Sequence, residues 1–245
     1  MGASGGMAEV DVVLPAHNEA DTIGVVLREF HSTVVATRLA VVRFVVCEDG
    51  SSDGTADVVR DLAREIPLEV VSSDTRKGYS RAVIDGLLAT SAALVAFVDS
   101  DGQCDPSDLP RFLEAIGGAD VVVGYRSPRV DPWYRMAMSK SFHLVYRRLF
   151  PVRLRDPSCP FVVMRQEALA QILRGRVGLL AQGFWWEFQA RAAAAGMTVV
   201  EVPCRHRPRL AGETRVYRPS AIPGIARRHL VALVRLRREL RTVYG

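Results

Sequence analysis

The sequence lacks the marks of a membrane-spanning, disulfide-stabilised or zinc-binding protein. No apolar run approaches the roughly 20 residues that cross a bilayer, and no signal peptide precedes the first apolar segment. The four cysteines of the 245-residue chain lie far apart without a C-x-x-C pair, which argues against a disulfide framework and fits a reducing cytoplasm. H-E-x-x-H is absent and no G-x-G-x-x-G follows Leu14, so a zinc protease has no support and a dehydrogenase is disfavoured.

Lysine is scarce as well: only Lys77 and Lys140 occur among the 32 basic residues. The net charge of +5 is concentrated at the C-terminal end. Between Pro203 and the last residue there are eleven arginines and only two acidic residues, Glu213 and Glu239. Such a segment indicates an anionic partner, either phosphate groups, an acidic lipid surface or nucleic acid. No aromatic-basic binding motif accompanies the arginines, so nucleic acid is not expected.

Short apolar, β-branched runs alternate with longer amphipathic stretches in the first half of the chain. The predicted strands are Val10–Leu14, Val41–Cys47, Leu68–Val71, Leu94–Val98 and Asp120–Val123. The predicted helices are Glu19 to about Thr37, Thr55–Glu65, Tyr79–Ser91 and Ser107–Ile116. This alternation predicts one α/β domain with a doubly wound, mostly parallel sheet and helices on both faces. Ligands bind such sheets at the carboxyl ends of the strands, so functional residues are expected in the loops there.

The pattern changes after Gly124. A strand is predicted at Phe161–Met164, a helix around Trp185–Ala195 and a further strand at Thr198–Val202. The final stretch mixes arginines with leucines and valines, which predicts a basic amphipathic helix. We therefore divide the chain into a disordered leader at 1–9, a domain at 10–224 with halves 10–124 and 125–224, and a C-terminal helix at 225–245.

Two carboxylates follow the fourth predicted strand, at Asp99 and Asp101. Carboxylate oxygens suit a hard cation, and Mg2+ or Mn2+ held by this pair would keep other positions for diphosphate oxygens. The same D-x-D string is also common as a turn or helix cap, so it is not specific alone.

Polar residues follow the other predicted strands in the same way. Glu48 and Asp49 end the second strand, where their carboxylates could hold a base or ribose hydroxyls. Lys77 and Gly78 precede a helix, where a cation and backbone N–H groups suit phosphate. The joint occurrence of these groups in this order makes the pattern specific.

The segments VVLPAHNEADTI, VVCEDGSSDGT, RKGYSRAVIDGL and FVDSDGQCDP together resemble family 2 glycosyltransferases with the GT-A fold, from Val10 to about Pro110. The resemblance implies that Asp99 and Asp101 hold the metal, with Gln103 as a further ligand. The nucleotide-sugar contacts expected on this basis are Pro15, Asn18, Glu19, Asp49, Ser51, Lys77, Asp99 and Ser100.

The second half resembles the polyprenyl-phosphate branch of this family and is similar to dolichol-phosphate mannose synthases. The segments that carry the resemblance are VVGYR, DPSCPFVVMR, FWWEFQARAAAAGMTVVEVP and GETRV. Two positions depart from the branch: Pro160 replaces a glycine, and Arg215 replaces a lysine. The residues 10–124 are thus expected to bind the nucleotide sugar and 125–224 the acceptor.

This resemblance implies inverting, metal-dependent transfer of a hexose, mannose or glucose, from a GDP- or UDP-linked donor to a polyprenyl phosphate. The enzyme would act peripherally on the cytoplasmic face of a membrane. A phosphate monoester has a second pKa of about 6 and needs no general base, but it does need cations. Arg126 and Arg135 are expected to seat the acceptor phosphate, and Arg215 could hold the donor diphosphate. Asp101, Arg126 and Arg215 are the predicted catalytic residues.

Several alternatives stay open at this point. Glu187 is either a base that activates an acceptor hydroxyl or a structural acid among aromatic neighbours. The acceptor could then be a soluble hydroxyl compound, either a natural product or a saccharide. An inactive nucleotide-binding scaffold is a further alternative. A phosphatase-type D-x-D nucleophile is disfavoured because that motif normally follows the first strand. The C-terminal helix could pack on the domain, meet anionic lipid, or do both.

Overall fold

The computed structural model describes residues 8–38, 40–128, 133–173, 183–210 and 222–244. The first half contains β1 (Ala8–Ala16), α1 (Ala20–Thr37), β2 (Ala40–Asp49), α2 (Thr55–Leu62), β3 (Leu68–Ser73), α3 (Tyr79–Leu88) and β4 (Leu94–Phe97). The second half contains α4 (Leu109–Ala115), β5 (Val121–Arg126), α5 (Trp133–Leu149), β6 (Val162–Arg165), α6 (Gln166–Leu173), α7 (Phe184–Ala194), β7 (Val199–Cys204) and α8 (Ile222–Tyr244).

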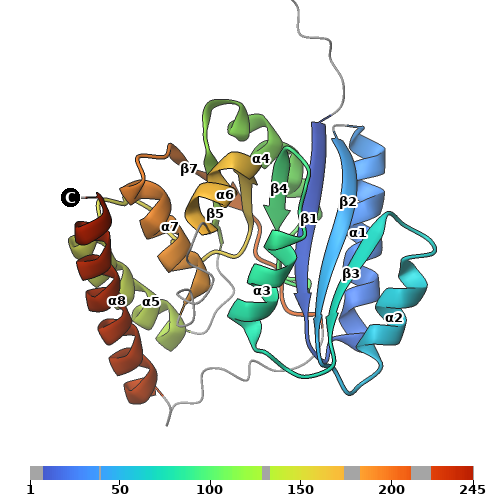
Figure 1. The fold of residues 1–245 in the computed structure, drawn as a ribbon, viewed down its shortest axis with the longest axis horizontal. Coiled ribbons are helices and arrows are strands. Elements are labelled where there is room, and N and C mark those ends of the chain that lie inside the picture. Colours follow the sequence, from blue (N-terminus) through green and yellow to red (C-terminus); the bar gives the residue numbers. More distant parts are fainter. Residues whose placement is uncertain (1–7, 39, 129–132, 174–182, 211–221, 245) are drawn as a thin grey trace, which may run out of the picture.

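The strands form one seven-stranded sheet in the order β3-β2-β1-β4-β6-β5-β7. Strands β1 to β4 are parallel, and helices α1 and α2 cover one face while α3 covers the other (Figure 1). This arrangement buries β1 and β2 on both faces, which explains why they are continuous valine-rich runs. The predicted doubly wound, mostly parallel α/β fold is confirmed.

Strand β6 is the exception, because it is antiparallel to both β4 and β5. Its first residue, Val162, pairs with Phe97 at the carboxyl end of β4, so the chain enters β6 at that edge of the sheet. The segment before β6 therefore lies beside the ends of β4 and β5. The apolar pattern of Phe161–Met164 predicted the strand but not its direction, since direction depends on where the preceding chain emerges.

Helix α8 packs on α5 and α7 rather than on the sheet (Figure 1). Its buried residues Leu233, Leu236 and Leu240 join a second apolar cluster, separate from the main core. Its apolar surface is divided, because Leu230 and Val231 are 53% and 59% exposed. The helix begins at Ile222, three residues before the expected 225. Among the described residues no helix is long and apolar enough to cross a bilayer.

The N-terminal end of the domain also differs from the expected boundary at residue 10. Strand β1 begins at Ala8, which pairs with Ala40 of β2, so Ala8 and Glu9 belong to the sheet rather than to a leader. The rest of the expected leader lies outside the described residues.

Candidate active site

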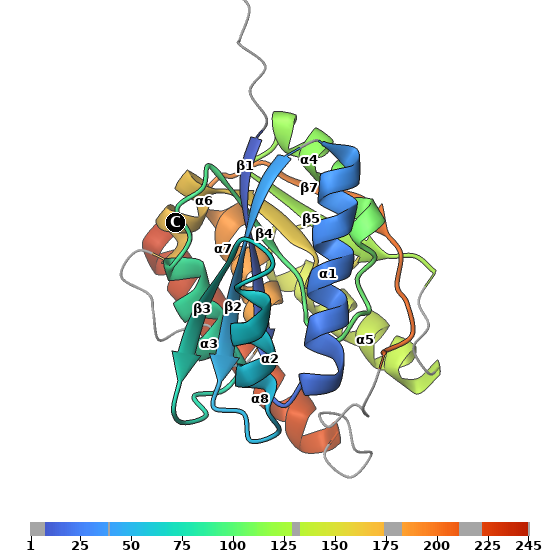
Figure 2. The same ribbon diagram turned by 90° about the vertical axis from the view of Figure 1, so that its right-hand side faces the viewer.

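A cleft of about 620 Å3 opens at the carboxyl ends of β1, β2 and β4. These strands are adjacent and parallel, so the loops that follow them converge at one edge of the sheet (Figure 2). The predicted residues that line the cleft are Pro15, Asn18, Glu19, Asp49, Asp99, Ser100 and Asp101. Polar side chains beyond the predicted set also line it, namely His17, Asp21, Thr22, Asp53, Arg76, Tyr79 and Arg209.

The loops after β1 and β2 hold each other in place by hydrogen bonds. The Asn18 N–H donates to Ser51 Oγ at 3.0 Å, and the Ser52 N–H donates to Asn18 Oδ1 at 2.9 Å. The Glu19 N–H donates to Thr55 Oγ1 at 2.9 Å. Asn18 has a φ of 56°, a left-handed conformation that asparagine adopts more readily than most residues. Ser51 thus shapes this wall of the cleft without lining it.

Asp49 fixes the loop between β3 and α3. Its two carboxylate oxygens accept hydrogen bonds from the Lys77 N–H at 2.6 Å and the Gly78 N–H at 2.8 Å. The Lys77 ammonium turns away from the cleft and pairs with Asp85 on α3. The Lys77 ammonium is thus held by Asp85 and does not line the cleft, and its contact with a phosphate stays a prediction. Arg76 is the cation of this loop that lines the cleft.

Asp99 lines the cleft, and the pKa of its carboxyl group is perturbed. Burial, and then the charge of Asp101, raise the pKa of Asp99 to about 7. Tyr79 Oη donates to Asp99 Oδ1 at 3.0 Å, and Trp185 Nε1 donates in turn to Tyr79 Oη at 3.2 Å. Two carboxylates so close together disfavour full ionisation unless a cation neutralises them.

The oxygens of Asp101 have different partners. Oδ1 accepts a hydrogen bond from the Gln103 N–H at 3.0 Å, while Oδ2 accepts one from Arg209 Nη2 at 2.8 Å. A guanidinium thus already occupies the place of a cation beside this carboxylate. The Asp99–Asp101 pair offers oxygen ligands, the pKa of Asp99 is raised, and Asp101 already attracts a positive charge. These three features fit a site for Mg2+ or Mn2+.

The protein by itself would supply an incomplete ligand set. Among the described residues, no group of three or more His, Cys, Asp or Glu side chains could hold a metal ion. Gln103 does not complete the set here, because its Nε2 donates to the Arg207 carbonyl at 3.3 Å and the residue does not line the cleft. A cation at Asp99 and Asp101 would leave positions for water and diphosphate oxygens, as Mg2+ prefers.

The model of the family described as glycosyl transferase family 2 matches residues 11–173, more than half of the chain. The chain belongs to this family. An uncharacterized glycosyltransferase of Mycobacterium tuberculosis is 34% identical over 213 residues, which are 84% of this chain and 89% of the relative. The polyprenol monophosphomannose synthase of Mycolicibacterium smegmatis is 28% identical over 216 residues, 84% of this chain and 80% of the synthase.

Solved structures of other proteins have a similar fold. Glucosyl-3-phosphoglycerate synthase from Mycobacterium tuberculosis, in complex with Mn2+, UDP and phosphoglyceric acid, has a TM-score of 0.69 at 18% identity, covering 94% of this chain and 78% of the synthase. The mannosyltransferase PcManGT from Pyrobaculum calidifontis, in complex with GDP-Man and Mn2+, has a TM-score of 0.67 at 19% identity. The match covers 94% of this chain and 64% of the mannosyltransferase. The fold is that of the GT-A glycosyltransferases, and this family 2 member is a glycosyltransferase.

Arg126 ends β5 at the same edge of the sheet in this glycosyltransferase. Its guanidinium makes a bidentate pair with Asp156, with Nε to Oδ2 at 2.6 Å and Nη2 to Oδ1 at 2.9 Å. Its positive charge lowers the pKa of Asp99, against the larger effect of burial. Arg126 is thus held as part of the scaffold next to the cleft, and an acceptor phosphate would have to share it with Asp156.

Glu187 is a structural acid in this fold. It is buried on α7, accepts a hydrogen bond from Arg191 Nη2 at 2.6 Å, and does not line the cleft. Arg191 is itself buried and extends Nη1 to Glu239 of α8 at 2.7 Å. Glu187 is therefore engaged with Arg191 away from the lining of the cleft, and its contact with an acceptor stays a prediction.

Two other predicted arginines are not placed. Arg215 lies outside the described residues. Arg135 lies on α5, but its side chain is outside what the structure describes. Arg209 is one of the cleft residues that the sequence did not predict. Nothing in the local sequence distinguishes it from the other arginines after Pro203, since only the contact with Asp101 does so.

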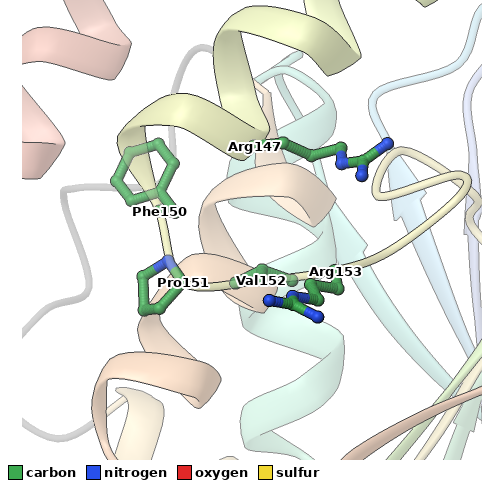
Figure 3. Close-up of a pocket in the computed structure, with 5 residues that line it drawn as sticks. All are labelled: Arg147, Phe150, Pro151, Val152 and Arg153. Atoms are coloured by element: carbon green, nitrogen blue, oxygen red, sulfur yellow. The ribbon is translucent and has the colours of Figure 1, made fainter.

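A separate cavity of about 440 Å3 lies at the end of α5, lined by Arg147, Phe150, Pro151, Val152 and Arg153 (Figure 3). It shares no lining residue with the cleft. It contains two arginines and no carboxylate, so it offers no site for a cation and lies apart from the D-x-D pair.

Proposed function

We propose that this glycosyltransferase transfers mannose or glucose from a GDP- or UDP-linked sugar to a polyprenyl phosphate, with inversion at the anomeric carbon. The observation that carries the proposal is the Asp99–Asp101 pair, set in a cleft at the carboxyl ends of β1, β2 and β4. Similarity to a polyprenol monophosphomannose synthase over most of both chains supports the acceptor class.

The donor side of the mechanism uses the residues that line the cleft. Pro15, Asn18, Glu19 and Asp49 would border the nucleoside. A Mg2+ or Mn2+ ion held by Asp99 and Asp101 would act as a Lewis acid toward the leaving diphosphate. Fixed positive groups stabilise charge that develops in the transition state, and Arg209 is placed to do so beside Asp101.

The acceptor side favours a phosphate over a hydroxyl group. A phosphate monoester is already an anion at neutral pH, so its oxygen needs no base to attack the anomeric carbon. A hydroxyl acceptor would need one, and Glu187 is engaged with Arg191 instead. Arg126 is the described arginine that we assign to the acceptor, with Arg135 and Arg215 as further contacts.

The exposed side of α8 suits contact with an anionic membrane. Leu230, Val231 and Val234 are exposed there. The exposed arginines of the helix are Arg227, Arg228, Arg235, Arg238 and Arg241. Its one acid, Glu239, pairs with Arg191. Aliphatic side chains between arginines are typical of helices that lie in the headgroup region. We assign the protein to the surface of an anionic membrane on this basis, and the four free cysteines favour the cytoplasmic face.

The experiment that tests the function is a matrix of donors and acceptors. GDP-mannose, GDP-glucose, UDP-mannose and UDP-glucose are each incubated with Mn2+ and a polyprenyl phosphate, the corresponding polyprenol, or soluble saccharides, and the products are identified by mass spectrometry. Transfer only to the polyprenyl phosphate is expected. Transfer only to polyprenol or saccharides would show that the acceptor is a hydroxyl compound. No transfer, together with no thermal shift by any nucleotide, would indicate an inactive scaffold.

A further inference from the structure

We propose that Arg209 is a built-in counter-cation, which neutralises Asp101 when no metal is bound and moves to the diphosphate when metal and nucleotide bind. The inference rests on the proposed metal and donor sites, and it adds that their two ligands are coupled through one side chain.

The guanidinium of Arg209 lies directly beside the proposed metal ligand Asp101. Arg209 Nη2 lies 2.8 Å from Asp101 Oδ2, and Nη1 lies 3.9 Å from Glu19 Oε1. The other oxygen of Asp101 is engaged by the Gln103 N–H, so Arg209 holds the oxygen that the loop leaves available. A divalent cation bound at that oxygen would meet the positive charge of the guanidinium at close range, and the two cannot share it favourably.

The backbone around Arg209 is fixed to the D-x-D loop by hydrogen bonds. The Leu210 N–H donates to the Asp101 carbonyl at 3.3 Å, and the Arg207 N–H donates to the Gln103 carbonyl at 2.9 Å. Gly102 has a φ of 76°, and a Cβ there would lie 2.4 Å from Leu210 Cδ1. Because the backbone is held on both sides, the side chain of Arg209 is the part that can move.

The side-chain environment allows that movement. The Arg209 side chain is 30% exposed while that of Asp101 is 10% exposed, so the guanidinium reaches into the cleft from a partly open position. An arginine side chain changes rotamer at little cost and forms its strongest hydrogen bonds with phosphate or carboxylate. A donor diphosphate entering the cleft would therefore offer Arg209 a replacement for Asp101.

A thermodynamic coupling follows. In the absence of nucleotide, a metal ion must compete with Arg209 for Asp101. Its apparent affinity is then the intrinsic affinity multiplied by the fraction of protein in which the Arg209–Asp101 contact is open. Partly exposed ion pairs contribute up to about 1 kcal/mol, which corresponds to about fivefold in affinity. A nucleoside diphosphate removes this competition, so each ligand raises the affinity of the other through Arg209.

Arg205 provides a matched control on the same segment. Its guanidinium lies 3.3 Å from Asp105, is 66% exposed, and does not line the cleft. Arg205→Gln removes a positive charge from the same segment after β7 but leaves Asp101 paired with Arg209. Arg209→Lys keeps a charge at position 209 and is expected to retain the competition.

The test is a Mn2+ titration followed by the electron paramagnetic resonance signal of free Mn2+, with and without GDP or UDP. We expect Arg209→Gln to bind Mn2+ alone about fivefold more tightly than the unsubstituted protein, and to show weaker coupling between Mn2+ and nucleotide. Arg205→Gln and Arg209→Lys should remain close to the unsubstituted protein. Melting temperatures establish that each variant is folded.

The outcomes separate this inference from the proposed function. Equal or weaker Mn2+ binding by Arg209→Gln, with binding abolished by Asp101→Ala, would overturn the role of Arg209 and leave the metal site in place. A fivefold gain in Arg205→Gln as well would also overturn it, since the effect would be one of overall charge. Absence of Mn2+ binding in every variant, with or without nucleotide, would refute the metal site and this inference together.

Discussion

The ion-pair network that joins α7 to α8 gives a quantitative prediction. Arg191 has a side chain that is 1% exposed and pairs with Glu187, which is 7% exposed, and with Glu239, which is 28% exposed. Arg191→Met keeps much of the volume and the aliphatic part of the side chain. It leaves the carboxylate of Glu187 buried without its partner.

The expected cost comes mainly from Glu187. Breaking a buried pair by removing one partner destabilises proteins by about 3–5 kcal/mol, whereas an exposed pair contributes about 1 kcal/mol or less. We therefore expect Arg191→Met to lower the free energy of unfolding by about 3 kcal/mol. Glu239→Gln should lower it by about 1 kcal/mol or less, because Glu239 can reach water. The double variant Arg191→Met/Glu187→Leu should recover most of the loss, because no unpaired charge remains buried.

The loss of stability caused by Arg191→Met should also grow as the pH rises. Burial raises the pKa of Glu187 above its usual value of 4.5, and the hydrogen bond from Arg191 opposes this. Removing Arg191 raises the pKa further. A carboxyl group with a raised folded-state pKa is best tolerated below its unfolded pKa, and its stability contribution is lost as the pH rises through the folded pKa. The difference between Arg191→Met and the unsubstituted protein should therefore be smallest near pH 4 and grow toward pH 8.

Urea unfolding followed by tryptophan fluorescence measures these differences. Arg191→Met is compared with the double variant and with Glu239→Gln at several pH values. A loss below 1 kcal/mol for Arg191→Met, or a loss that does not change with pH, would refute the reasoning that Glu187 is a buried charge held by Arg191.

Three further predictions concern the site and the membrane. Asp101→Ala should abolish transfer and Mn2+-dependent donor binding, and unchanged turnover would remove the metal assignment. Arg126→Ala should raise the KM for polyprenyl phosphate more than the KM for the donor, and it should also lower the melting temperature by removing the bidentate pair with Asp156; equal effects on both KM values would remove its acceptor role. Replacing Leu230 and Arg238 by aspartate should weaken cosedimentation with anionic vesicles by about tenfold or more, since each basic residue near such a surface contributes about 1 kcal/mol. Unchanged cosedimentation would show that another surface meets the lipid.

The predicted site residues come together in one cleft where local sequence decides the geometry. Asp99, Asp101 and Asn18 follow strands whose apolar pattern was plain, and parallel strands bring such loops to one edge. The contacts predicted for Lys77 and Glu187 stay predictions, since neither side chain lines the cleft in this structure. Both side chains have partners on helices, Asp85 on α3 and Arg191 on α7, and which partner lies nearer cannot be predicted from the amino-acid order.

The element pattern, the family and the carboxylate pair of the cleft can all be predicted from the amino-acid order. These depend on periodicity and on residues a few positions apart, which the chain order fixes. Tertiary structure alone decided the direction of β6, the pairing of Arg126 with Asp156, and the contact of Arg209 with Asp101. An arginine pairs with the carboxylate that the fold brings within about 3 Å, and that distance depends on how the strands and helices pack rather than on residues near it in the chain.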